Sequence, residues 1–186
     1  MAKNRKTVFT TVLTALCVAM IAVISQIAFP TPLGIPVTLQ VFAVALCSYL
    51  LGVKLATVAV LVYVTMGAIG LPVFYGLRGG ISAIIGEVTG GFIVGFLPLA
   101  VLCGLGTTVF WKRCGKWLCL LFGEIGLILC HVCGVCFYSA LTGVDVFSAI
   151  AVTSLPFILK DALLIAAAFL IAPKISSAIA RSGYKI

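Results

Sequence analysis

The sequence contains very little charge. Only 9% of its 186 residues are charged and only four are acidic, whereas soluble domains usually contain about 25% charged residues. This scarcity excludes an ordinary soluble domain. Hydrophobic residues make up 63% of the chain and the mean hydropathy is +1.35. We therefore expect an all-α integral membrane protein whose length fits a single domain of about six spans.

The sequence also lacks the motifs of common catalytic chemistry. It has no nucleophile–base pattern and no redox motif. The glycine-rich stretch 70–91 has neither the lysine-serine/threonine ending of a Walker loop nor the preceding strand of a dinucleotide loop. We expect no enzyme activity, no catalytic residues and no cofactor. The net charge of +8 would suggest a nucleic-acid partner in a soluble protein, but here the excess of cations on cytoplasmic loops explains it and no such partner is expected.

Cysteine is not scarce, but its placement argues against disulfides. Of the eight cysteines, all except Cys114 fall inside apolar segments, where they act as small helix residues. Cys130, Cys133 and Cys136 accompany His131 in one such segment, which leaves a membrane thiol or metal enzyme as a remote alternative. A zinc site would need a further ligand in place, so we expect ordinary packing and no metal.

Apolar segments and their boundaries predict one six-helix membrane domain over residues 1–186. Pro30–Val37 contains three prolines and cannot be helical, and Asp145 is placed to cap a short helix over 146–152. A glycine-rich outer loop is expected at 70–87. Such irregular backbone must be buried in protein or line a cavity, because lipid cannot satisfy its peptide groups. The expected spans are 7–29, 38–52, 55–69, 88–110, 117–141 and 154–172.

The distribution of cations predicts that both termini are cytoplasmic. In this topology, ten of the twelve basic residues fall on the cytoplasmic side and none of the four acids lies in an inner loop or tail. Basic residues concentrate in cytoplasmic loops of membrane proteins. The ten residues are Lys3, Arg5, Lys6, Lys54, Lys112, Arg113, Lys116, Lys174, Arg181 and Lys185.

The two remaining cations lie close in sequence to two acids. Arg78 lies in the glycine-rich loop and, with Glu87, flanks the entry to the fourth span, and Lys160 and Asp161 lie near the outer end of the last span. Ionisable groups inside a membrane protein are costly and usually face a cavity. We favour a single outward-facing site formed by all four. The alternative is two structural ion pairs, although adjacent residues point about 100° apart on a helix and are poorly placed to pair.

Several segments together resemble the BioY family, the biotin-specific substrate-binding (S) components of energy-coupling-factor (ECF) transporters. They are IPVTLQ at 35–40, GAIGLPVF at 67–74, TGGF at 89–92, and Pro156 and Phe157 followed by Asp161. The resemblance runs from about residue 7 to 172. It implies an S-component-like bundle of six helices in the bacterial cytoplasmic membrane, which binds biotin and has no ATPase of its own. The implied partners are a transmembrane coupling (T) subunit and two ATPase subunits. Ala15 and Ala19 match the Ala-x-x-x-Ala pattern that the family carries at the docking face.

The sequence departs from the family pattern at the expected site. Leu164 stands where the family has a lysine, and Lys160 stands where a small residue is usual. Biotin presents a ureido group, an apolar bicycle and a valerate carboxylate. We expect Asp161 to accept the ureido N–H donors, since such bonds are charge-assisted. The sequence leaves the identity of the ligand open between biotin, desthiobiotin and lipoate. A purely structural subunit would bind none of them.

The remaining candidate site residues follow from the chemistry of the ligand. Phe74 and Tyr75 are expected to flank the bicycle, and Gly79 and Gly80 to let backbone N–H groups come close to the ligand. Arg78 is the first candidate for the carboxylate because its planar fork matches that group, and Lys160 is the second. Glu87 belongs to the same polar cluster, and Gln40 and Gln26 could add polar contacts.

Overall fold

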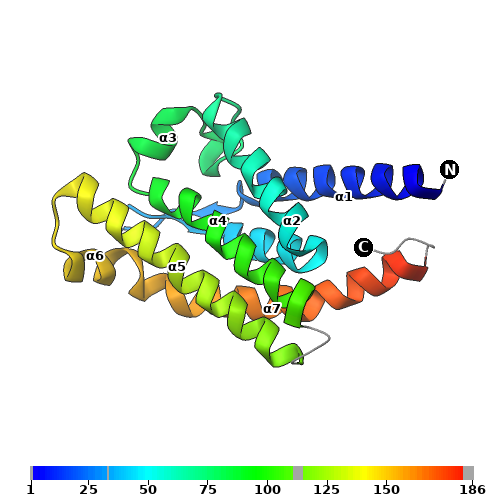
Figure 1. Ribbon diagram of the computed structural model, residues 1–186. Helices are drawn as coiled ribbons and strands as arrows, with labels where there is room; N and C mark the ends of the chain where they lie inside the picture. The colour runs from blue at the N-terminus through cyan, green and yellow to red at the C-terminus, as the bar shows by residue number, and fades with distance from the viewer. Residues whose placement is uncertain (1, 33, 111–114, 182–186) are drawn as a thin grey trace.

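The computed structural model describes residues 2–32, 34–110 and 115–181. Long helices dominate it, with a two-residue antiparallel pairing of strands between the first two (Figure 1). In chain order the elements are α1 Ala2–Ile24, β1 Ala28–Phe29, β2 Val37–Thr38, α2 Gln40–Ala68, the 3₁₀ turn η1 Tyr75–Leu77, α3 Ile81–Ile85, α4 Gly90–Leu105, the π-helical segment η2 Gly106–Phe110, α5 Lys116–Thr142, α6 Val146–Thr153 and α7 Leu155–Arg181.

Five of these helices are long and apolar enough to cross a membrane. They are α1, α2, α4 with η2, α5 and α7, and the most apolar window of each has a mean hydropathy between 2.0 and 2.4. A helix satisfies its own backbone hydrogen bonds, which lipid cannot do. The N-terminal end of α1 and the C-terminal end of α7 lie at the same end of the molecule, and α6 and the start of α4 lie at the other (Figure 1).

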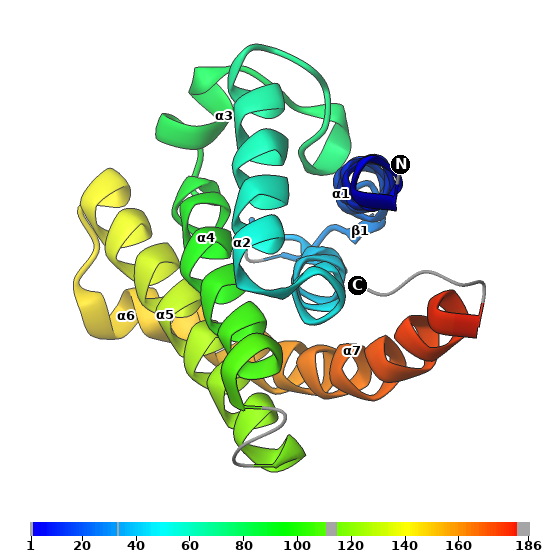
Figure 2. The ribbon, with the colours of Figure 1, turned by 45° about the vertical axis from the view of Figure 1, so that its right-hand side comes forward.

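Helix α2 contains a sharp break at Gly52. Its backbone has φ 72° and ψ 171°, a left-handed conformation that favours glycine. The break frees the N–H of Val53, which donates to Thr108 Oγ1 in η2 at 3.1 Å. Residues 40–51 and 53–68 therefore run in different directions, and in Figure 2 the first is seen nearly end-on beside the second. The expected turn lies at Gly52 rather than at Lys54. The six-span topology with cytoplasmic termini stays a prediction.

Helices α4 and α5 approach each other closely through glycines. A Cβ at Gly95 would lie 2.8 Å from the backbone of Cys130, and a Cβ at Gly91 would lie 3.0 Å from that of Gly134. Small residues allow this closeness, which replaces the hydrophobic driving force that is absent between helices in lipid. The contact fixes the middle of α5, including His131, beside the first turns of α4.

Some predicted boundaries are confirmed and others are wrong. The fifth span matches α5 to within a residue at each end, and Asp145 caps α6 by accepting from the Ser148 N–H at 3.1 Å. Helix α1 ends at Ile24 rather than 29, because Gln26 and the following residues turn toward β1. Helix α7 continues through Pro173 to Arg181 instead of ending at 172.

The outer loop and the cysteines also differ in detail from the expectation. The stretch 70–87 includes the helical turns η1 and α3, which the sequence did not indicate. Every cysteine in the described ranges is free. The predicted cytoplasmic positions Lys112, Arg113 and Lys185, together with Cys114, lie outside the described residues.

Candidate functional site

A pocket opens at the end of the bundle away from the chain ends, between the start of α2, the start of α4 and the start of α7. About 540 Å³ of the space here is not filled by atoms, a volume that includes the open mouth. Aromatic and apolar side chains form most of its wall. The lining residues are Ile35, Pro36, Thr38, Gln40, Val41, Tyr75, Thr89, Phe92, Ile93, Phe96, Thr153, Phe157, Lys160 and Asp161.

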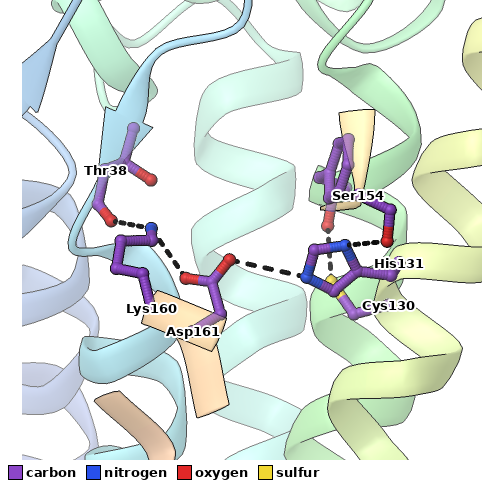
Figure 3. A network of polar contacts seen from close by, with 7 residues as sticks. Thr38, Cys130, His131, Ser154, Lys160 and Asp161 are labelled. Atoms are coloured by element: carbon purple, nitrogen blue, oxygen red, sulfur yellow. Dashed lines mark hydrogen bonds and ion pairs between the residues drawn. The ribbon is translucent and has the colours of Figure 1, made fainter. Parts of the chain in front are cut away.

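Lys160 and Asp161 bring opposite charges into this pocket. The short helix α6 and the tight turn at Ser154 direct the start of α7 across the pocket floor, with Phe157 and Asp161 four residues apart on its buried side. Lys160 Nζ donates to the carbonyl oxygen of Thr38 at 2.9 Å and lies 2.7 Å from Asp161 Oδ1 (Figure 3). The expectation that these adjacent residues would not pair is wrong, because the long lysine side chain bends around the helix to reach its neighbour.

Two buried polar atoms of the pocket have unused hydrogen-bonding capacity. Asp161 Oδ1 and Thr89 Oγ1 are inaccessible to solvent, and neither makes a hydrogen bond to any part of the chain that the structure describes. Oδ1 is close to the lysine ammonium, but that contact lies outside hydrogen-bond geometry. Buried polar groups without partners are rare in folded proteins. Asp161 and Thr89 both line the pocket, which makes them candidates for hydrogen bonds to a ligand.

His131 is the polar neighbour of the pocket that the sequence analysis assigned to ordinary packing. It is 4% exposed, and its Nε2 lies 3.5 Å from Asp161 Oδ2, while its Nδ1 is 2.9 Å from Ser154 Oγ (Figure 3). The one available signal was that this sole histidine lies in an apolar span, since intramembrane ionisable residues are usually functional. Because His131 and Asp161 are far apart in the sequence and lie on different helices, their contact could not be predicted from the sequence.

The glycine-rich loop contributes Tyr75 to the pocket but not its charged pair. Arg78 and Glu87 form an ion pair outside the lining, and their side chains are 47% and 29% exposed. The hydrogen bond to Glu87 raises the pKa of the Arg78 guanidinium. The guanidinium also lies 4.7 Å from the centre of the Tyr75 ring. The structure therefore does not bring Arg78 and Glu87 into one pocket with Lys160 and Asp161.

Other expected site residues stabilise the loop. Phe74 is 1% exposed and packs edge-on against Tyr63 in the core, so the aromatic wall consists of Tyr75 and three phenylalanines that were not predicted. The Gly80 N–H donates to Gly67 O at 2.7 Å, and a Cβ at Gly79 would collide with the backbone of Leu71. These glycines close the loop onto the end of α2 and do not line the pocket. Gln40 does line it and donates to Tyr63 Oη at 3.1 Å.

The remaining candidates lie away from the pocket. Ala15 and Ala19 are exposed on α1. No group of His, Cys, Asp and Glu suited to a metal ion occurs within residues 2–32, 34–110 and 115–181, and Cys130, Cys133 and Cys136 range from buried to exposed. The ammonium of Lys116, at the start of α5, lies 5.7 Å from the centre of the Trp117 ring.

Fold and pocket together define a multi-pass α-helical membrane protein with a partly open, largely apolar pocket near one end. The BioY family model matches residues 1–181, and the chain belongs to this family. The chain is 41% identical over 142 residues to "Biotin transporter BioY" of Thermotoga maritima, covering 76% of this chain and 81% of the relative. It is 37% identical over 164 residues to "Probable biotin transporter BioY" of Pyrococcus horikoshii, and the match covers 88% of this chain and 93% of the relative.

A solved structure has the same fold. The S-component for biotin from an ECF-type ABC transporter, a crystal structure at 2.1 Å, superposes with a TM-score of 0.84 and 23% identity, covering 92% of this chain and 93% of that one. This likeness extends to the bundle as a whole, so the S-component-like fold inferred from sequence is confirmed.

Proposed function

We propose that this protein is the high-affinity biotin-binding S component of an ATP-driven ECF-type vitamin-uptake transporter in a bacterial cytoplasmic membrane. It is a transporter subunit rather than an enzyme, and it works with a transmembrane coupling subunit and two ATPase subunits. Binding requires no metal or cofactor. Family membership and the names of the relatives support this proposal, and the chemistry of the pocket supports biotin in particular.

The observation that carries the proposal is the carboxylate of Asp161 in a largely apolar pocket, where its Oδ1 is paired with the Lys160 ammonium but makes no hydrogen bond to the described residues. A cyclic urea offers two N–H donors, and a carboxylate is the strongest acceptor that a side chain can present to them. Thr89 Oγ1 can donate to the urea carbonyl, since a hydroxyl both donates and accepts. Phe92, Phe96 and Phe157 present apolar surface to the bicycle.

The charge of the ligand requires a cation, and Lys160 is the one that lines the pocket. Its ammonium has three donors and makes one hydrogen bond in the described structure, to Thr38 O. Donors therefore remain for the valerate carboxylate, which the flexible lysine stem reaches by turning its ammonium away from Asp161 Oδ1, 2.7 Å distant, toward the other end of the ligand. Lysine at 160 replaces, one helical turn earlier, the cation that the family pattern would place at Leu164.

Replacing Asp161 with asparagine tests the proposal. The substitution keeps the size of the side chain but turns one acceptor into a donor that faces the urea donors, so biotin affinity should fall at least tenfold, which is about 1.4 kcal/mol. The measurement is isothermal titration calorimetry on protein purified from biotin-limited cells, with desthiobiotin and lipoate titrated in parallel.

Asp145→Asn is the matched control. It makes the same chemical change at an exposed helix cap outside the pocket, and asparagine caps a helix as well as aspartate does. Its affinity should equal that of the unaltered protein. Unchanged biotin affinity in Asp161→Asn would remove the assignment of Asp161. Tighter binding of lipoate than of biotin by the unaltered protein would identify a sister specificity, and no binding of any of the three would leave a structural subunit.

A further inference from the structure

The contacts of His131 assign it a part in ligand recognition. We propose that His131, held by Ser154, is a positioning residue that orients the carboxylate of Asp161 and thereby determines the selectivity of the pocket for ligands with paired N–H donors. The inference rests on the proposed function, because it concerns the same pocket and the same ligand class.

The ring of His131 is held in place on two sides. Its Nδ1 lies 2.9 Å from Ser154 Oγ, in the turn where α6 meets α7. The rings of His131 and Phe92 also pack in a T-shaped arrangement, with centroids 5.5 Å apart and an interplanar angle of 90°. Ser154 is buried, and Phe92 lines the pocket. With its position fixed in this way, the ring presents Nε2 toward Asp161.

The two partners determine which ring nitrogen carries the proton. An ionised carboxylate can only accept hydrogen bonds, whereas a hydroxyl can donate one. The arrangement that suits both partners has the proton on Nε2, directed toward Asp161 Oδ2 at 3.5 Å, and Nδ1 accepting from the Ser154 hydroxyl. The contact to Oδ2 is long for a hydrogen bond, as is common for binding sites before the ligand tightens them.

This arrangement divides the two carboxylate oxygens between different tasks. Oδ2 faces His131, and Oδ1 faces the Lys160 ammonium without a hydrogen bond in the described structure (Figure 3). Without His131 the ion pair with Lys160 would be the remaining side-chain contact of the carboxylate in the described structure, and its acceptor lone pairs would be aimed less firmly at the ligand. The charged and titratable groups around this centre are Lys160 and Asp161 on α7, Cys130 on α5 and Tyr75 in the loop.

Substitutions at position 131 can separate the two contacts of the ring. The amide nitrogen of glutamine reaches about as far as Nε2, so His131→Gln keeps a donor toward Asp161. The shorter His131→Asn keeps a partner for Ser154 but not for Asp161, and His131→Leu keeps neither. We expect biotin affinity within threefold of the unaltered protein for His131→Gln, and at least a tenfold loss for His131→Asn and His131→Leu.

The experiment measures biotin, desthiobiotin and lipoate affinities by calorimetry and the melting temperature of each variant. Cys136→Ala, an exposed change on the same helix, is the control. For His131→Leu, the affinities for the two cyclic ureas, biotin and desthiobiotin, should fall, while the affinity for lipoate stays within threefold. The preference of the pocket for cyclic ureas over lipoate therefore becomes smaller. A purely structural contribution would instead weaken all ligands in parallel with the melting temperature, and that result would overturn the inference.

The failure of this inference and the failure of the proposed function are distinguishable. If the unaltered protein binds biotin tightly and His131→Leu binds it equally well, only the positioning part is wrong. If the unaltered protein binds neither biotin nor desthiobiotin, the proposed function is wrong. Rescue by glutamine but not by asparagine supports the contact to Asp161, whereas rescue by asparagine alone would show that Ser154 is the partner that matters.

Discussion

The ammonium of Lys160 contacts two oxygen atoms of the protein. Its ammonium contacts Thr38 O at 2.9 Å and Asp161 Oδ1 at 2.7 Å, and its side chain is 28% exposed. A partly buried lysine that still has a free donor is suited to bind an anion entering from the mouth of the pocket. Arg78, by contrast, already has a carboxylate partner in Glu87. The two cations therefore differ in what they can offer to a ligand carboxylate.

This difference gives a prediction about which cation binds the valerate group. Lys160→Gln should weaken biotin binding at least tenfold, since it removes the cation of the pocket. Arg78→Gln should change it less than threefold. Both variants are titrated with biotin and with the uncharged biotin amide. If Lys160 contacts the ligand carboxylate, the loss caused by Lys160→Gln should be clearly smaller for the amide than for biotin.

An equal loss for both ligands would mean that Lys160 acts only by neutralising Asp161. If Arg78→Gln loses much affinity for biotin but little for the amide, Arg78 binds the ligand carboxylate, as was expected from the sequence. The two variants are controls for each other, because each removes one cation and leaves an acid without its ion-pair partner.

At the scale of elements, a partly buried side chain, Gln26, helps to hold the loop 70–87 in place. Gln26 donates from Nε2 to Ala22 O at 3.0 Å and to Phe74 O at 3.0 Å, and its Oε1 accepts from the Leu77 N–H at 2.9 Å. Gln26 therefore ties the end of α1 to the segment that carries Tyr75. It contacts backbone in the described structure rather than the pocket, which agrees with a structural group.

Removing this tether should accelerate ligand release. Gln26→Leu keeps the bulk of the side chain but none of its hydrogen bonds, so the Phe74 carbonyl and the Leu77 N–H lose this partner. The penalty for a fully buried group is about 1–3 kcal/mol, and it is smaller here because the first contact is partly buried and the second is exposed. The loop should then open more often, and biotin dissociation should be at least fivefold faster in a chase experiment with labelled ligand. Association should change little, because the pocket itself is unaltered.

Glu87→Gln is the comparison for this prediction. It breaks the Arg78–Glu87 ion pair, which is partly exposed, and exposed pairs contribute little, typically 0–1 kcal/mol. Dissociation should be less than twofold faster. If Glu87→Gln releases biotin faster than Gln26→Leu does, the ion pair and not the partly buried amide holds the loop closed.

The elements also show what can be predicted from sequence. The bounds of α5 and the capped helix α6 follow from local signals, namely the apolar run, the flanking cations and an aspartate before a helix. Asp161 in a pocket follows from the cost of an acid in an apolar span. Phe74 and His131 could not be placed in this way. Whether an aromatic ring faces the core or the pocket, and which acid a histidine meets, depends on helix packing between residues far apart in the chain.

At the scale of the whole molecule, α1 differs from the other membrane helices. Only 17% of its most apolar window is buried, against 33–61% for the other four. Cys17, Val18 and Ile21 pack into the core, while Ala15 and Ala19 lie on the exposed side. Small residues at such a spacing allow close approach of another helix in lipid. A helix of this kind at the edge of the bundle provides a surface for a partner without disturbing the pocket.

We therefore expect bulky residues on this surface to block assembly and leave binding intact. Ala15→Trp and Ala19→Trp place an indole where another helix would pack, whereas Ala140→Trp makes the same change at an exposed position near the outer end of α5. Each variant is co-expressed with the coupling and ATPase subunits of the transporter. Co-purification should be lost at positions 15 and 19 and kept at position 140, and all three isolated variants should bind biotin as the unaltered protein does. Normal co-purification of both α1 variants would place the docking surface elsewhere. Loss of biotin binding in them would show that α1 supports the pocket, because Gln26, two residues beyond the end of α1, hydrogen-bonds to the segment that carries Tyr75.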